Sequence, residues 1–347
     1  MNFLSDNISR IAPRILDAIA AANSGVAAAF GGDELTARVE RRISGIFEHD
    51  VKVLLVVTGT AANALSLAAM VSPQGTIICH HYSHIVEEEA STLEVFSGGT
   101  RLLGVAGAHG KLTTASVVAL LSRGFGAIGH GRRSAAISLS QATEAGTVYR
   151  PAEIGEIAEV ARRHGLGVHV DGARFANAVA FLDVSPADLS WRAGVDILTV
   201  GASKNGALAV EAVICFNPQY ADALSHLCKS SGHLVAKMRF LSAQLEAYFA
   251  DDFWLRQACH ANQAAQRLAS GLSGLPNANI SHPIEANEVF VALPESVLSG
   301  LESLGHHFHR WGDESEGQIR LVTNWDTNLA DVDAFAGAVA QLYNQMT

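Results

Sequence analysis

Asp196-Ile-Leu-Thr-Val200-Gly-Ala-Ser-Lys204-Asn-Gly206 is the stretch that decides the fold class. An apolar run ends here in a loop of small residues, and a lysine stands inside that loop. In a sheet buried on both faces, ligands gather where the strands end. A lysine at such an end can be desolvated and directed at a ligand, as an amine that forms a Schiff base must be. Any single lysine is more often a solvated surface residue, but this chain has only five lysines.

Comparable apolar runs recur on both sides of this stretch, between about residues 50 and 216. Several of the intervening segments have helical spacing, as in EIGEIAEVARRH at residues 153–164. Short apolar strands that alternate with helices predict an α/β fold, with a mostly parallel sheet covered by helices on both faces. Seven strands are expected, at residues 53–57, 76–79, 102–105, 135–139, 167–170, 197–200 and 213–216.

The pattern changes after residue 216. Residues 218–272 are mainly helical in spacing, and later strand candidates at 288–293 and 318–323 flank helices at 294–304 and 330–345. This order predicts a smaller α+β domain at the C-terminal end. The expected division is an N-terminal arm over residues 1–25, a large domain over 26–245 and a small domain over 246–347.

The bulk composition narrows the class of protein. A chain of 347 residues with 49% hydrophobic content can bury a large core, and its length suits about two domains. The net charge is −10 and no block of Lys or Arg occurs, which argues against nucleic acid and against an anionic membrane surface. The four cysteines are scattered, and we find neither a secretory signal nor a membrane-length apolar run. We therefore expect a cytoplasmic protein.

A second strand end lies at Thr58-Gly59-Thr60, where an apolar run passes through a turn into a helix rich in Ala and Leu. The N-terminus of a helix presents free N–H groups and the positive end of the helix dipole, which together suit a phosphate. A plain threonine-capped turn would look the same, and for this motif alone it is the better interpretation.

A third strand, His169-Val170-Asp171, ends in an acid. A carboxylate here could hold a protonated pyridine nitrogen and so keep the ring an electron sink. A cap for the next helix is the common alternative. The order of phosphate turn, acid and lysine, each at a strand end, is nevertheless what a Schiff-base cofactor with a phosphate needs, and coincidence of all three is improbable.

Two other patterns point elsewhere and are set aside. The sequence GFGAIG at residues 124–129 satisfies G-x-G-x-x-G, but it follows a helical stretch rather than a strand, so we interpret it as a flexible loop and not as a dinucleotide site. The clustered histidines lack cysteine or acidic partners at a known ligand spacing, so we expect no metal. Those histidines are His80, His81, His84, His306, His307 and His309.

Several motifs together resemble the threonine aldolase / β-eliminating lyase family of fold-type-I pyridoxal-phosphate enzymes, most closely its phenylserine aldolase and low-specificity L-threonine aldolase branch. The resemblance covers essentially the whole chain. The motifs lie at residues 5–7, 30–36, 59–63, 83–85, 141–144, 169–174, 203–206, 237–243 and 319–323. It implies the fold-type-I, transferase-like architecture, pyridoxal 5'-phosphate as cofactor, and a homodimer or homotetramer with shared active sites.

The resemblance also implies roles for residues around the cofactor. Lys204 would carry the aldimine, Asp171 would pair with the pyridine nitrogen, and His84 would stack on the ring. Gly59 and Thr60 would hold the phosphate. The remaining cofactor positions implied in this way are Gln141, Ser203, Arg174, Lys229 and Lys237, the last two reaching the phosphate of a neighbouring subunit.

On the substrate side, the resemblance implies that Ser5, Arg174 and Arg320 clamp the carboxylate. A guanidinium fork matches a carboxylate with two hydrogen bonds. The sequence departs from the family at Glu144, where many threonine aldolases have histidine, and at Phe30, where tyrosine is usual. These departures concern the substrate side chain and not the cofactor.

The implied reaction is cleavage of a β-hydroxy-α-amino acid to glycine and an aldehyde. The base could be His84, Glu144 or a bound water, and a base near neutral pH favours His84. Rivals on the same scaffold are a β-eliminating lyase and an aminotransferase; a non-catalytic cofactor-binding protein is more distant. Because Phe30 offers an apolar ring near the expected entrance, we expect phenylserine-like substrates to be preferred over threonine.

Overall fold

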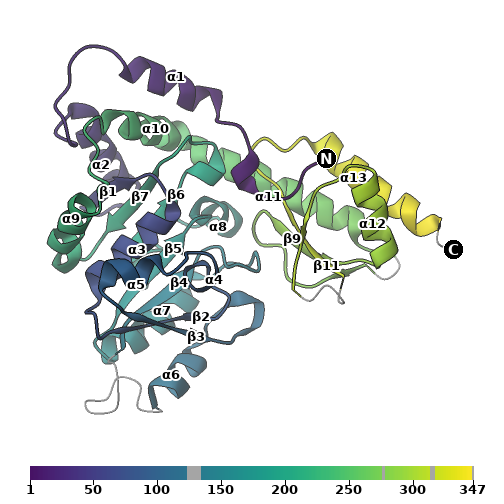
Figure 1. The fold of residues 1–347 in the computed structure, drawn as a ribbon, viewed down its shortest axis with the longest axis horizontal. Helices are drawn as coiled ribbons and strands as arrows, with labels where there is room; N and C mark the ends of the chain where they lie inside the picture. Colours follow the sequence, from purple (N-terminus) through teal and green to yellow (C-terminus); the bar gives the residue numbers. More distant parts are fainter. Residues whose placement is uncertain (123–133, 276–277, 313–316, 346–347) are drawn as a thin grey trace.

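Two sheets organise the computed structural model, which describes residues 1–122, 134–275, 278–312 and 317–345 (Figure 1). The larger sheet has the order β1-β7-β6-β5-β4-β2-β3, and only β7 runs antiparallel to its neighbours. The mostly parallel seven-stranded sheet is therefore confirmed. Its strands are β1 (Lys52–Val56), β2 (Thr76–His80), β3 (Arg101–Val105), β4 (Ser134–Ser140), β5 (Gly167–Gly172), β6 (Ile197–Gly201) and β7 (Glu211–Cys215).

Helices cover both faces of this sheet, which explains why its central strands β5 and β6 are almost entirely buried. One hydrophobic cluster joins α2, α7, α8 and α10 to the sheet, and a second joins α3 and α9. The helices of this part are α1 (Pro13–Ala22), α2 (Glu34–Phe47), α3 (Gly59–Met70), α4 (His84–Glu87), α5 (Thr92–Ser97), α6 (Thr114–Ser122), α7 (Pro151–Arg163), α8 (Phe175–Leu182), α9 (Ala221–Ser230) and α10 (Arg239–Phe249). The glycine motif at 124–129 lies outside the described residues.

The smaller sheet, with the order β10-β11-β9-β8, is antiparallel and packs on the C-terminal helices (Figure 1). The α+β character expected for this end of the chain is present. Its elements are α11 (Phe253–Leu272), β8 (Asn279–Ile280), β9 (Glu288–Ala292), α12 (Glu295–Ser303), β10 (His309–Arg310), β11 (Gln318–Val322) and α13 (Leu329–Asn344).

Helix α11 connects the two parts. Its N-terminal half, with Trp254 and Ala258, packs into the core of the large sheet, and its C-terminal half, with Leu268 and Leu272, packs into the core of the small one. The chain thus passes from one hydrophobic core to the other within α11. The boundary expected between residues 245 and 246 lies earlier in the chain, inside α10. The domain boundaries expected from the sequence stay predictions.

The N-terminal segment crosses between the two parts before it reaches α1 (Figure 1). The amide of Phe3 donates to the carbonyl of His307, and the amide of Val322 donates to the carbonyl of Phe3. The Phe3 ring packs edge-on against Phe335 at 5.2 Å. The segment therefore belongs to the small domain's core, and the short helix that follows it, η1 (Asp6–Ile8), is carried to the large domain.

Candidate active site

The carboxyl ends of β4, β5 and β6 bring three polar residues side by side. Strand register aligns Ser140 with Asp171, and Asp171 with Thr199. Just beyond, a Cβ on Gly201 would lie 2.5 Å from the carbonyl oxygen of Ala173, so only glycine lets the loops after β5 and β6 approach this closely. The loop with the acid and the loop with the lysine are thereby packed against each other, as their positions at strand ends predict.

Lys204 lies in the short helix η4 (Ser203–Asn205), half-buried directly after β6. Within the described part of the chain its ammonium has no hydrogen-bond or ion-pair partner. The loop itself is fixed by Glu211, whose carboxylate accepts a hydrogen bond from the amide of Ala202 at 2.8 Å. Burial raises the pKa of Glu211 to about 7. A rigid loop with an uncommitted amine suits an amine that must bond to a ligand.

Asp171 belongs to a continuous network, here called the Asn63 network, in which all members but the half-buried His84 are buried: Asn63, Glu89, His84, Asp171 and Thr199. The amide nitrogen of Asn63 donates to Asp171 at 2.8 Å and to Glu89 at 2.9 Å, while its oxygen accepts from Thr199 at 3.1 Å. The second oxygen of Asp171 accepts from the amide of Ala173 at 3.0 Å. These donors hold Asp171 in one orientation at the sheet edge.

His84 is coupled to the same network through Glu89. Its Nδ1 lies 2.9 Å from a carboxylate oxygen of Glu89, whose side chain is buried. The hydrogen bond to Glu89 raises the pKa of His84, against the opposing effect of burial. Burial also raises the pKa of Glu89. The pair therefore fixes the imidazole ring and favours its protonated form relative to a free histidine.

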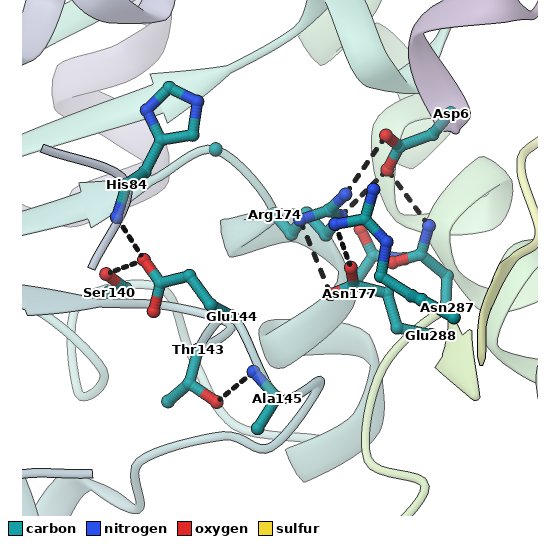
Figure 2. A network of polar contacts seen from close by, with 12 residues as sticks. Asp6, His84, Ser140, Thr143, Glu144, Ala145, Arg174, Asn177, Asn287 and Glu288 are labelled. Carbon is teal, nitrogen blue, oxygen red and sulfur yellow. Dashed lines mark hydrogen bonds and ion pairs between the residues drawn. The ribbon is translucent and has the colours of Figure 1, made fainter. Parts of the chain in front are cut away.

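Glu144 lies next to His84 (Figure 2). One carboxylate oxygen accepts hydrogen bonds from the amide of His84 at 2.8 Å and from the hydroxyl of Ser140 at 2.7 Å. The other oxygen is buried and has no partner among the described residues. Burial raises the pKa of Glu144 to about 7. Glu144 can therefore gain or lose a proton near neutral pH, as a general base must.

The arginine pair, Arg174 and Arg320, lies where the N-terminal segment and the small domain meet the large sheet. Arg174 forms two hydrogen bonds with Asp6, at 2.8 and 3.1 Å, and lies 3.4 Å from Glu288 (Figure 2). Although burial opposes charge on both partners, their pairing raises the pKa of Arg174 and lowers that of Asp6. Burial lowers the pKa of Arg320, whose Nε has no partner among the described residues.

The turn before α3 keeps its predicted form. The side chain of Thr58 caps the helix by accepting from the amide of Ala61 at 3.1 Å. A Cβ on Gly59 would meet no atom within 4 Å, so the first turn of α3 is open. An open helix N-terminus suits a phosphate group. Together with the free amine of Lys204 and the carboxylate of Asp171, it provides three groups that fit pyridoxal 5'-phosphate.

The side chains of three other predicted site residues are bonded to nearby backbone groups. Gln141 is fully buried and both ends of its amide bond to the backbone of Tyr149. Ser5 caps η1 through the amide of Asn7, and Ser203 lies 3.4 Å from the amide of Val210. Their assignment to the cofactor or the substrate stays a prediction.

Phe30 and Lys237 lie near each other, because the amide of Phe30 bonds to the carbonyl of Ala236. Phe30 is exposed and has a φ of +57°. Lys229 lies in the last turn of α9, and this helix lies at the outer edge of the large domain in Figure 1. No hydrogen bond or ion pair within the described ranges connects any of these three side chains to Lys204.

Metal-ligating atoms of His84, Glu89 and Asp171 lie within 4.8 Å of one another. In this structure each already forms a hydrogen bond inside the Asn63 network, which accounts for the grouping without an ion. His80 and His81 are close to His84 in the sequence, but their rings contact backbone carbonyls of residues 105–107.

Comparison with known proteins identifies the family. The sequence matches the family described as beta-eliminating lyase over residues 2–296. The chain belongs to this family. It is 41% identical to a low specificity L-threonine aldolase of Pseudomonas aeruginosa, over 96% of this chain and 95% of that protein. A second relative of the same name, from Pseudomonas sp. strain NCIMB 10558, is 39% identical over 97% and 96% of the two chains.

The fold comparison agrees. A structure of Leishmania major threonine aldolase superposes with a TM-score of 0.92 at 26% identity, covering 99% of both chains. The beta-eliminating lyase family and its threonine aldolases act with pyridoxal phosphate, so the fold class, the cofactor and the expectation of a lyase are confirmed. No helix in the described ranges is both long and apolar enough to span a bilayer.

Four residues that shape the site were not predicted from the sequence, namely Asn63, Glu89, Asp6 and Glu288. Asn63 and Asp6 stand inside motifs that we quoted for the resemblance, so a buried polar residue in each was available as a signal. Glu288 begins an apolar strand, and an acid in such a place is unusual. Glu89 follows two other glutamates, and nothing in the sequence separates the three.

Proposed function

We propose that the protein cleaves a β-hydroxy-α-amino acid to glycine and an aldehyde. The observation that carries this proposal is that two proton-accepting groups, His84 and Glu144, lie at the sheet edge that also bears Lys204 and Asp171. Aldol cleavage needs a base for the β-hydroxyl proton as well as an electron-withdrawing cofactor. The names of the two Pseudomonas relatives support the same activity.

The residues have separate tasks in this reaction. Lys204 would hold pyridoxal phosphate covalently, Asp171 would bind its pyridine nitrogen, and the first turn of α3 with Gly59 and Thr60 would bind its phosphate. The cofactor, when bound, withdraws electrons from the bond to be broken. Hydrogen bonds of the Asn63 network connect His84 to Asp171. In this position the imidazole ring of His84 can lie against the cofactor.

On the substrate side, Arg320 is the better placed carboxylate ligand. The Nε and one terminal nitrogen of Arg174 already donate to Asp6, whereas the Nε of Arg320 has no partner among the described residues. A carboxylate bound at Arg320 restricts rotation of the substrate and so orients its Cα–Cβ bond. Arg174 and Ser5 would then contribute by positioning this end of the site.

The free oxygen of Glu144 can accept the proton of the β-hydroxyl group. With a pKa of about 7, Glu144 is ionised in part at neutral pH and can return the proton later. His84, whose pKa is also raised, is the alternative, and a water held between the two is a third. Removing each group in turn separates these routes by their pH profiles.

We also propose a homo-oligomer with shared active sites, located in the cytoplasm. In support, no hydrogen bond or ion pair among the described residues joins Phe30, Lys229 or Lys237 to Lys204 of the same chain, so a second copy could use them. Phe30 is exposed, which favours such a shared position. The four cysteines are all free, as in a reducing compartment. Light scattering that gives an active monomer would refute the shared site.

For the substrate we propose a preference for phenylserine-like side chains over threonine, since Phe30 would offer an apolar ring to a neighbouring site. The experiment measures glycine release from threonine, allo-threonine, phenylserine and serine. Glycine with an aldehyde supports aldol cleavage, whereas a keto acid would support one of the two alternatives on this scaffold, transamination or β-elimination, the reaction after which the family is described. Threonine cleaved much faster than phenylserine would refute the preference.

Lys204→Ala tests the cofactor assignment directly. Wild-type protein should be yellow, and borohydride should fix the cofactor to Lys204 with loss of the absorbance band. The variant should lose both this covalent bond and nearly all turnover, while Lys52→Ala, an exposed lysine paired with Glu40, should retain them. A colourless wild-type protein that stays inactive with added pyridoxal phosphate would contradict the assignment.

A further inference from the structure

Glu288 is a buried carboxylate whose hydrogen-bonding capacity is unused. Its side chain is fully buried at the start of β9, and neither carboxylate oxygen has a hydrogen-bond partner among the described residues. Two guanidinium groups face it, Arg174 at 3.4 Å and Arg320 at 3.8 Å, both beyond normal hydrogen-bond length. A buried carboxylate without hydrogen bonds lowers the stability of the folded state, because its desolvation is not compensated. We therefore expect its charge to have a functional role.

The position of Glu288 is rigidly determined. It lies opposite Val322 in the antiparallel pair of β9 and β11, and therefore on the same face as Arg320, two residues away. From the large domain, Gly146 packs against it: a Cβ at Gly146 would lie 3.1 Å from that of Glu288. The loop that carries Glu144 thus packs against the Cβ and backbone of Glu288, whose carboxylate faces the arginine pair.

The charges around the arginine pair balance. Asp6 and Glu288 supply two carboxylates against the two guanidinium groups of Arg174 and Arg320. Lys204, another cation nearby, would be committed to the cofactor. An incoming α-carboxylate therefore finds a directed donor in Arg320 but no surplus of positive charge. A second carboxylate on the same ligand would meet the negative charges of Glu288 and Asp6, which face the arginine pair.

We propose that Glu288 is a specificity residue that limits the site to amino acids whose side chain carries no negative charge. The proposal deepens the function proposed above and rests on it, because it takes the arginine pair as the place where the amino-acid carboxylate binds. Glu288 acts through repulsion of the wrong ligand, which is how many sites discriminate between ligands of equal shape. Uncharged side chains, including aromatic ones, do not experience this repulsion.

L-Aspartate and L-asparagine test the proposal, since they share one shape and differ by one charge. Their binding to the holoenzyme is measured by calorimetry at pH 8, for wild type and for Glu288→Gln. Both ligands use the same α-carboxylate contact, so any general weakening of the arginine pair cancels in the ratio of their Kd values. Wild type should prefer asparagine by about tenfold or more, and Glu288→Gln should reduce that ratio by about tenfold.

Glu302→Gln is the matched control. This glutamate lies exposed on α12 and pairs with Arg310, so its loss changes the net charge equally but leaves the site intact. The control should keep the wild-type ratio. Glu288→Met, which replaces the acid by an uncharged side chain of similar length, serves if the glutamine variant does not fold.

Two outcomes would overturn the proposal: equal affinity of wild type for aspartate and asparagine, or an unchanged ratio in a folded Glu288 variant. Failure of the proposed function gives a different result. If wild type released no glycine from any β-hydroxy amino acid but still preferred asparagine and lost that preference with Glu288, the specificity role would stand and the aldol cleavage would not.

Discussion

The Asn63 network and the arginine pair lie in the same site but differ in how completely their polar groups are paired. In the network, Asn63 uses both ends of its amide and Asp171 uses both oxygens, although one buried oxygen of Glu89 has no partner among the described residues. Around the arginine pair, the Nε of Arg320 and both oxygens of Glu288 have no hydrogen-bond partner among the described residues. One half of the site is preassembled on a single sheet edge, and the other is a charge cluster between separately folded parts.

This difference predicts that the two halves of the site have different roles, one in turnover and the other in substrate binding. Groups that are fixed before a ligand arrives can stabilise a transition state without reorganising, which favours turnover. Groups with unused donors gain most when a ligand supplies the acceptor, which favours binding. Substitutions in the network should therefore lower kcat, and substitutions at the arginine pair should raise KM.

Asp171→Asn should give the largest effect. Asparagine has the shape of aspartate and can keep the contact with Asn63, but the pyridine nitrogen of the cofactor loses its anionic partner. We therefore expect kcat to fall by about 100-fold or more with KM nearly unchanged. Steady-state kinetics with the best substrate of the panel checks this, and Asp188→Asn on the surface is the control. Near-normal turnover would refute the pairing of Asp171 with the pyridine.

Arg320→Lys should affect binding instead. A lysine keeps the charge but not the paired hydrogen bonds, so KM should rise by about 10- to 100-fold while kcat changes much less. Arg310→Lys, on the neighbouring strand β10 and paired with exposed glutamates, provides a matched control. A loss confined to kcat would contradict the division between the two halves.

Glu144→Gln sharpens the comparison, because Glu144 lies between the halves. Turnover should fall by at least about tenfold and substrate affinity should fall less, since His84 remains as a second base. Burial raises the pKa of Glu144 to about 7, so wild-type activity that needs the ionised form should increase through this pH, and the variant should lose that increase. A pH profile identical to wild type would exclude Glu144 as the base.

Glu89→Gln should produce the smallest change in rate, only a few-fold, with a diagnostic shift in pH dependence. The hydrogen bond from Glu89 raises the pKa of His84, so its loss should lower that pKa. If neutral His84 is the active form, the acidic limb of the kcat profile moves to lower pH. Glu87→Gln, an exposed neighbour in α4, should leave the profile in place, and a shift to higher pH would contradict the coupling.

The sequence predicted the preassembled half better than the other. Apolar runs mark the strands, and a lysine or an acid directly after a strand marks the edge where ligands bind, so Lys204 and Asp171 could be found. Glu89 could not be found in this way. It is the last of three consecutive glutamates, and only the structure shows that it is the buried one. Asp6 pairs with Arg174 across 168 positions, and no local pattern encodes a contact of that range.

The N-terminal segment has a consequence for how the site forms during synthesis. Asp6 leaves the ribosome early, yet its partner Asn287 follows 281 residues later. Contacts so distant in sequence form late and slowly, because the intervening chain must first be ordered. The large sheet can therefore fold while the chain is still growing, but the arginine pair stays incomplete until the last strands emerge. Activity should consequently appear in a slower phase than secondary structure when the protein is refolded.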